Sequence, residues 1–192
     1  MKLLRSKGFW VGAVAVALLV VVALTASGRD YVSYHPELID PMRGAPLGDY
    51  GGAGADYWFG VEPLTGRDLF ARLGLSLQYS LGLAVVAAAV EVLVGLLIAV
   101  AARRGRWRGL GAPALMYFAL LVPLNLIVEV ALSYTGMRLR TPPEPAWGEM
   151  LADAALWFRH DPAYLLFPGL LLVVTVFAFL LVADAVRRKL VR

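Results

Sequence analysis

The sequence predicts an all-α membrane protein with four transmembrane helices, and three observations support this fold class. The chain has 192 residues, of which 60% are hydrophobic, and its mean hydropathy is +0.71. Apolar runs long enough to cross a bilayer core of about 30 Å lie at residues 9–27, 79–102, 113–135 and 164–184. Only 17% of the residues are charged, and most of them lie between these runs.

The first run follows three basic residues, as the apolar segment of a signal peptide would. From Phe9 to Ala26 it is longer than the roughly 7–15 residues of such a segment, and no clean small-x-small cleavage site follows. We therefore expect residues 1–27 to form an uncleaved anchor span. Within a single membrane domain, 1–192, residues 28–78 would then form an outer loop and interfacial helix, and 79–192 the core.

The distribution of Lys and Arg predicts the orientation of the spans. The segments 1–8, 103–112 and 185–192 contain basic residues and no acid, whereas the segments 28–78 and 136–163 contain seven arginines and eleven acids. Basic residues accumulate in short cytoplasmic segments. Both termini are therefore expected in the cytoplasm. The basic inner residues are Lys2, Arg5, Lys7, Arg103, Arg104, Arg106, Arg108, Arg187, Arg188, Lys189 and Arg192.

The two outer segments differ in their local patterns. Residues 28–62 show neither helical nor strand periodicity and are rich in Gly, Pro and Asp, which predicts a loop with turns. In the second outer segment a short helix is expected to begin at Trp147. The aromatic residues Trp157, Phe158 and Tyr164 are expected to anchor it at the membrane interface.

The stretch "PLTGRDLF" has the features of a helix start. Thr65 is a good N-cap, and Asp68 stands three residues later, as in a capping box. Apolar residues at helical spacing over 69–78 predict an amphipathic helix along the outer membrane surface, before the chain turns inward at Tyr79. The alternative is that this stretch is simply a well-capped helix.

Two spans carry polar residues that are candidates for function or for helix packing. Glu91 lies halfway along the second span, on a face of small residues that lets another helix approach closely. In the third span Asn125, Glu129 and Ser133 form a polar stripe. Intramembrane carboxylates are functional candidates, and buried contacts between helices are the alternative. Asp184, before Arg187, is instead expected to form local ion pairs.

Several classes of function are excluded or disfavoured. The chain has no cysteine, which excludes disulfides and thiolate chemistry. His35 and His160 have no His or Cys nearby at ligand spacing, so neither a metal site nor a cofactor is expected. No phosphate-binding loop, nucleophile elbow or HExxH motif occurs, and catalysis is not expected. The net charge of +4 does not indicate nucleic-acid binding, because the basic residues flank the apolar runs.

Two stretches of the chain resemble one family. The first is "PLTGRDLFARLGLSLQYSLGLAVVAAAVEVLVGLLIAVAA", and the second runs from "LIVEVALSYTGM" through "PPEPAWGEMLADA" to "LFPGLLLVVTVFAFLLVADAVRR". They are similar to the inner-membrane permease subunits of bacterial oligopeptide, dipeptide and nickel ABC importers, in particular the second permease of each pair. The residues at the family's motif positions are Gly66, Arg67, Asp68, Glu129, Ser133, Trp147, Gly148, Phe167, Pro168, Gly169, Asp184 and Arg187.

The resemblance implies a role and a set of partners. It implies an importer subunit for peptides or related solutes in the inner membrane, with membrane lipid, a second permease, separate ABC ATPase subunits and an extracytoplasmic solute-binding protein as partners. Compared with the members of the family that it resembles, the chain is expected to lack a pair of spans between "RRGRWRGLG" and "APALMYFALLVP". With them would be missing the cytoplasmic Glu-Ala-Ala loop, which in that family docks into the ATPase. A shortened, non-transporting relative that acts in assembly or regulation therefore remains the alternative. The sequence does not identify the solute.

Overall fold

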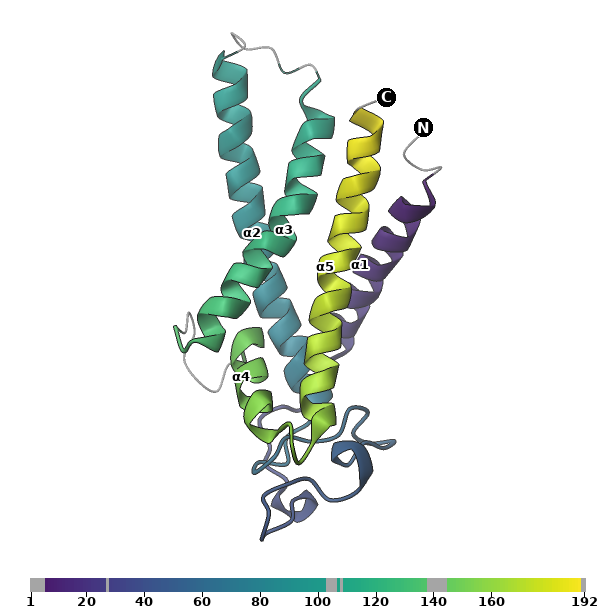
Figure 1. Cartoon of the computed structure of the whole chain (residues 1–192), viewed down its shortest axis with the longest axis vertical. Helices are drawn as coiled ribbons and strands as arrows, with labels where there is room; N and C mark the ends of the chain where they lie inside the picture. The colour runs from purple at the N-terminus through teal and green to yellow at the C-terminus, as the bar shows by residue number, and fades with distance from the viewer. Residues whose placement is uncertain (1–5, 27, 103–106, 108, 138–144, 191–192) are drawn as a thin grey trace. The chain divides into compact units, whose positions relative to one another are not determined.

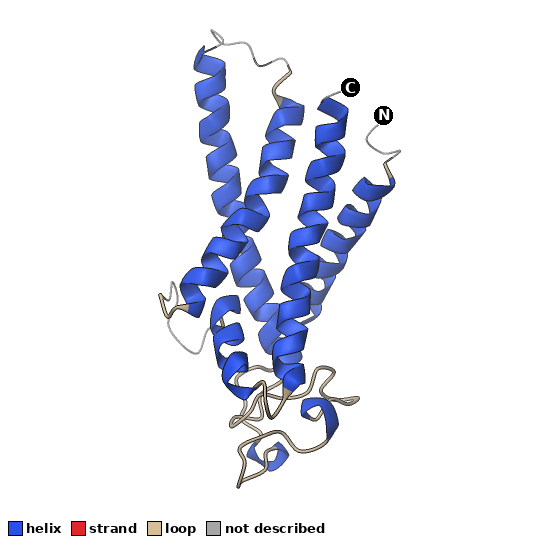
Figure 2. Cartoon of the chain, in the orientation of Figure 1, coloured by secondary structure: helices blue, strands red, loops and turns tan. Residues whose placement is uncertain are grey.

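The computed structural model describes residues 6–26, 28–102, 107, 109–137 and 145–190. Within these ranges the regular structure is helical (Figure 2), and extended pairing is limited to isolated bridges between Ile39 and Pro46 and between Val61 and Asp68. Figure 1 labels the long helices. The elements are α1 (Lys7–Ala26), η2 (Pro36–Leu38), η3 (Asp49–Gly51), α2 (Leu69–Ala102), α3 (Gly111–Tyr134), α4 (Trp147–Trp157) and α5 (Pro162–Leu190).

Four helices, α1, α2, α3 and α5, are long and apolar enough to cross a membrane. Their mean hydropathies over the most apolar window are 2.6, 2.8, 2.1 and 2.8. The four predicted spans are thus confirmed as apolar helices of membrane-crossing length, although α2 and α5 extend beyond the predicted ends. The short helix expected from Trp147 is also present as α4, and residues 28–62 form a loop with turns. Most basic residues of the inner segments lie outside the described ranges.

The chain forms two compact units, and each of the four long helices contributes a part to both. Unit 1 comprises Met1–Leu19, Leu81–Val128 and Val173–Arg192, and unit 2 comprises Val20–Ser80 and Glu129–Leu172. In unit 1, the start of α1, the end of α2, the start of α3 and the end of α5 lie toward the same side (Figure 1). Unit 2 contains α4 and the outer loop.

Small residues allow close helix contacts in unit 1. A Cβ added to Gly12 of α1 would lie 2.7 Å from the carbonyl oxygen of Ala178 in α5 and 2.9 Å from Val182. Residues of this size let two helix backbones approach each other in the absence of a strong hydrophobic driving force in lipid. Gly12 therefore fixes the contact between α1 and α5.

Trp147 lies at the centre of unit 2 and is fully buried. Its backbone nitrogen donates a hydrogen bond to the Ser80 hydroxyl over 3.2 Å, and its indole Nε1 donates to the carbonyl oxygen of Pro168 over 3.2 Å. A buried indole N–H needs such a partner. Trp147 thereby connects the start of α4 with both α2 and α5.

Gly148, next to Trp147, brings α4 directly against α3. A Cβ at this position would lie 2.0 Å from the carbonyl oxygen of Val130 and 2.4 Å from the Ser133 hydroxyl. No side chain fits at these distances, so the Trp-Gly pair has a structural explanation in which the tryptophan fills the core and the glycine permits contact.

The start of α2 corrects one prediction from the sequence. The N-cap is Asp68, whose Oδ1 accepts hydrogen bonds from the backbone nitrogens of Phe70 and Ala71 over 2.8 and 3.3 Å. Thr65 instead donates to Glu62 Oε2 over 3.0 Å. The prediction of Thr65 as N-cap is wrong because Gly66 follows it with φ of 69°, a left-handed conformation that interrupts the helical path.

A second correction concerns the expected interfacial helix. Helix α2 runs without a break from Leu69 to Ala102, so the predicted inward turn at Tyr79 is wrong. The apolar face over residues 69–78, which includes Leu69, Leu73 and Leu77, is buried within unit 2. Amphipathic spacing alone does not reveal whether such a face meets lipid or protein, and here it meets protein.

We predict that Gly148→Ala lowers the free energy of unfolding by about 1–3 kcal/mol, because the added methyl group overpacks a backbone contact. Gly82→Ala is the matched control in a helix, since nothing lies within 4 Å of a Cβ there. It should be neutral or stabilising, because alanine is the better helix former. Thermal denaturation of both purified variants in the same detergent tests this, and equal midpoints would contradict the packing role of Gly148.

Candidate functional site

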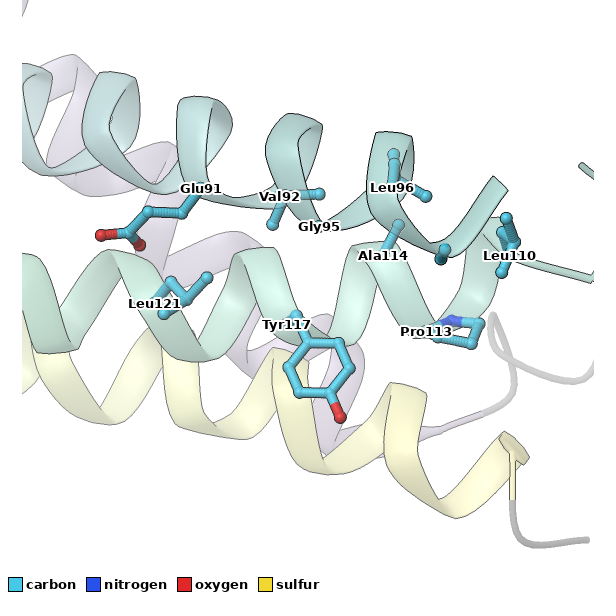
Figure 3. Close-up of a pocket in the computed structure, with 10 residues that line it drawn as sticks. Glu91, Val92, Gly95, Leu96, Leu110, Pro113, Ala114, Tyr117 and Leu121 are labelled. Atoms are coloured by element: carbon cyan, nitrogen blue, oxygen red, sulfur yellow. The ribbon is translucent and has the colours of Figure 1, made fainter. Parts of the chain in front are cut away.

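The first candidate site lies in unit 1, where α2 and α3 each carry one of the polar residues selected from the sequence. The Asn125 side-chain amide donates a hydrogen bond to Glu91 Oε2 over 3.0 Å. Figure 3 shows the Glu91 carboxylate between the two helices. The sequence identified both residues but not their pairing, which depends on how α2 and α3 are aligned.

A cavity of about 430 Å³ extends along α2 and α3 from this pair (Figure 3). Besides Glu91, its walls are mostly apolar or small, and they include Val92, Gly95, Leu96, Ala114, Tyr117 and Leu121. No atom lies within 4 Å of a Cβ added to Gly95. The small-residue face predicted around Glu91 is therefore open at Gly95, whereas Ala84 and Ala88 on the same face are buried.

Glu91 itself is exposed in this chain. A carboxylate among lipid tails is strongly unfavourable unless it is paired or protonated. Asn125 supplies one donor and leaves further acceptor positions of the carboxylate open to a group from outside the chain.

Glu129 has different surroundings, although it lies on the same helix as Asn125. It is buried in unit 2, where the Ser133 hydroxyl donates to its carboxylate over 3.2 Å and to its backbone oxygen over 2.8 Å. The structure thus divides the predicted polar stripe, since Asn125 bonds with Glu91 and Ser133 with Glu129.

The second candidate site is the Gly66-Arg67-Asp68 turn in unit 2. A Cβ at Gly66 would lie 2.1 Å from the carbonyl oxygen of His35, so only glycine fits. The Arg67 guanidinium lies 5.0 Å from the ring centre of Tyr31 and 4.3 Å from that of Tyr34, and it donates to the Tyr34 hydroxyl over 2.7 Å. Such contacts between a guanidinium and aromatic rings are attractive.

Asp68 completes this turn with an ion pair to Arg29, the first charged residue after α1. The Arg29 guanidinium also lies 5.3 Å from the Trp58 ring and 5.8 Å from the Phe70 ring. The three residues of the turn therefore bind the two ends of the outer loop to each other. This is a structural explanation for the Gly-Arg-Asp motif.

A buried ion network around Arg72 was not identified from the sequence. Arg72 Nη1 lies 3.0 Å from Glu62 Oε1 and donates to the Tyr164 hydroxyl over 2.6 Å, while Nη2 donates to Asp153 Oδ2 over 2.7 Å. Tyr164 is buried, so its prediction as an interfacial anchor is wrong. The signal in the sequence was Arg72 itself, a charge within the apolar face over residues 69–78.

Burial raises the pKa of Glu62 above its ordinary value of 4.5, and the positive charge of Arg72 partly offsets this effect. The folded protein therefore binds more protons at Glu62 than the unfolded chain does just above pH 4.5. The contribution of Glu62 to stability falls as the pH rises through this window. Only a nearby cation makes the ionised form tolerable at neutral pH.

The remaining residues selected from the sequence have structural roles or open surroundings. Asp184 accepts from Arg187 over 3.1 Å and from Arg188 over 2.6 Å, which confirms the expected local ion pairs. Pro168 provides the carbonyl acceptor for Trp147, and Gly169 has no atom within 4 Å of an added Cβ. In the described part of the chain, no group of three or more His, Asp or Glu residues could hold a metal ion.

No family model matches this chain. Part of it is similar to permeases of solute transport systems. The oligopeptide transport system permease protein OppC of Salmonella typhimurium is 39% identical over 75 residues. The glutathione transport system permease protein GsiD of Pectobacterium atrosepticum is 33% identical over 75 residues, and the nickel transport system permease protein NikC of Escherichia coli is 37% identical over 79 residues.

These alignments cover 39%, 39% and 41% of this chain and only 24%, 25% and 28% of the respective relatives. The chain therefore matches about a quarter of the length of the relatives. Part of the chain is thus similar to permeases, and its four long apolar helices are of a length and composition able to cross a membrane.

We predict that Arg72→Met lowers the free energy of unfolding by about 3–5 kcal/mol, because it leaves Glu62 buried without its cation. A second substitution in the same chain, Glu62→Gln, should restore part of this loss, since it removes the uncompensated charge. Denaturation of the single and double variants measures the coupling. If the two substitutions change the free energy of unfolding additively, the ion pair is contradicted. It is also contradicted if the free energy of unfolding of Glu62→Gln depends on pH above 4.5 in the same way as that of the unsubstituted protein.

Proposed function

We propose that this chain is a membrane-spanning permease subunit of an ATP-driven importer for peptides or related small solutes. The observation that carries the proposal is the similarity to the OppC, GsiD and NikC permeases, whose names specify oligopeptide, glutathione and nickel transport. The four apolar helices are consistent with this role. ATP hydrolysis would reside in separate ABC ATPase subunits, and an extracytoplasmic solute-binding protein would deliver the solute to the outer loops.

The open face around Glu91 is the proposed contact with a second permease subunit. Its small residues admit a helix backbone, and the carboxylate offers an acceptor for a donor on that helix. The closed surroundings of Glu129 favour a role within this chain instead. Among the intramembrane candidates, Glu91 is therefore the one proposed to act between subunits.

We place the chain in the cell inner membrane with both termini in the cytoplasm. The basis is the positive charge at one side of unit 1, where Lys7 begins α1 and Arg187, Arg188 and Lys189 end α5. The acidic loop over residues 28–62 would then lie outside. This arrangement follows the rule that Lys and Arg remain on the cytoplasmic side.

A second role is supported by the connection between α2 and α3. Helix α2 ends at Ala102 and α3 begins at Gly111, so only residues 103–110 separate two helices able to span the membrane. This connection leaves no room for the Glu-Ala-Ala coupling helix of the family that the sequence resembles. The chain could then act with another permease in assembly or regulation rather than in transport.

Because the chain lacks cysteine, single-cysteine labelling tests the orientation. We predict that Met42→Cys, at a position that is 92% exposed in the outer loop, reacts with a membrane-impermeant maleimide in intact spheroplasts. Lys189→Cys, at the end of α5, should react only after the membrane is disrupted. Equal labelling of both variants in intact spheroplasts would contradict the proposed arrangement.

Purification of the tagged chain from detergent-solubilised membranes tests its partners. Recovery of a second permease together with ABC ATPase subunits is expected for a transporting subunit, whereas recovery of a permease alone would favour the second role. Glu91→Leu should reduce recovery of the permease by about three-fold, the effect of losing one average interhelical hydrogen bond. Asp184→Asn, at an exposed ion pair, is the control and should leave recovery unchanged.

A further inference from the structure

Unit 2 contains a second cavity, which none of the roles above uses. It has a volume of about 480 Å³ and lies between the outer-loop segment 45–51 and the segment 160–167 at the start of α5. This volume falls in the range typical of sites for small organic molecules.

The side chains around this cavity combine negative charge with apolar and aromatic surface. Among the described residues that line it, the acids are Asp49 and Asp161, the one imidazole is His160, and Lys and Arg are absent. Tyr50, Leu166 and Phe167 supply aromatic and apolar walls. The chemistry of the walls therefore favours a positively charged organic group over an anion.

Asp161 is the residue on which the argument depends, because it is only 5% exposed. Its Oδ1 accepts a hydrogen bond from the backbone nitrogen of Ala163 over 3.1 Å and so caps α5. Its Oδ2 has no hydrogen-bond partner. A buried acceptor without a donor is costly, and a neutral residue could have supplied the cap alone.

Gly51 packs directly against Asp161 Oδ2. A Cβ added to Gly51 would lie 2.6 Å from this oxygen, and Gly51 has φ of 71°, so no other residue fits without strain. Gly48 and Gly52 nearby also have positive φ.

We propose that this cavity binds an organic ammonium ion, whose charged head pairs with Asp161 and whose apolar body lies against Leu166 and Phe167. An ammonium supplies the donor that Oδ2 lacks, and its attraction to a carboxylate is stronger in buried surroundings than in water. Aromatic walls add a favourable contact with the cation. Burial raises the pKa of the Asp161 carboxyl, as expected for a charge without a partner. The inference does not depend on the proposed transport role.

Isothermal titration calorimetry on the purified full chain in detergent micelles tests this proposal with two matched probes. Phenethylammonium carries the charged head, and 2-phenylethanol has the same apolar body without the charge. We expect phenethylammonium to bind at least about ten-fold more tightly, the size of one charge-assisted hydrogen bond. N-acetyl-lysine methylamide, titrated in parallel, distinguishes a protein lysine from a free amine as the source of the ammonium. Equal affinity for phenethylammonium and 2-phenylethanol overturns the proposal, and so does failure of both ammonium probes to bind.

Variants separate the site from the net charge of the protein. Asp161→Asn keeps the cap acceptor and should reduce phenethylammonium affinity at least about ten-fold while circular dichroism stays unchanged. Asp30→Asn is the charge-matched control, because Asp30 is exposed in the outer loop and does not line the cavity. An equal loss in both variants, or no loss in Asp161→Asn, overturns the proposal. If Asp161→Asn does not fold, the test uses Leu166→Trp, which fills part of the cavity wall. This variant should reduce the affinity for phenethylammonium, and an unchanged affinity would overturn the proposal.

Discussion

The buried guanidinium of Arg72 is the interaction on which the organisation of unit 2 depends. It joins Glu62 of the outer loop, Asp153 of α4 and Tyr164 of α5 to the first turns of α2. A lone buried charge is strongly unfavourable, whereas one that is surrounded by acceptors is tolerated and fixes the geometry of its partners. Segments far apart in the sequence are thereby brought to one point, and the apolar contacts of Leu69, Trp147 and their neighbours surround it.

The two glutamates within the apolar helices, Glu91 and Glu129, differ in how the cost of a carboxylate in apolar surroundings is reduced. Glu129 is enclosed by its own unit and bonds with Ser133 on the next turn of the same helix. Glu91 bonds with Asn125 across to a neighbouring helix and still borders an open apolar cavity. Chemically identical side chains therefore differ in what they can do, since the Glu129 carboxylate is enclosed within the chain, whereas the exposed Glu91 carboxylate can accept a hydrogen bond from outside.

Features set by local patterns could be predicted from the sequence. Apolar length was enough for the four spans, and the spacing of Asp184 with Arg187 and Arg188 was enough for their ion pairs. The N-cap was misplaced because the left-handed conformation of Gly66 is set by its contact with His35, far away in the sequence. The burial of Tyr164, which depends on Arg72, was missed for the same reason. The sequence thus indicated which residues were candidates, whereas the structure was needed to show which of them bond to each other.

The ion pair between Arg29 and Asp68 makes the outer loop a closed structure with its two ends joined. Arg67, held between Tyr31 and Tyr34, reinforces the same junction. The contacts at the two ends of the loop therefore already bear the entropic cost of closing it. In such a loop, doubling the length of the connecting segment adds only about 0.6 kcal/mol of closure free energy. An insertion at the exposed residues 53–55, outside the cavity-lining segment 45–51, should therefore cost little closure free energy.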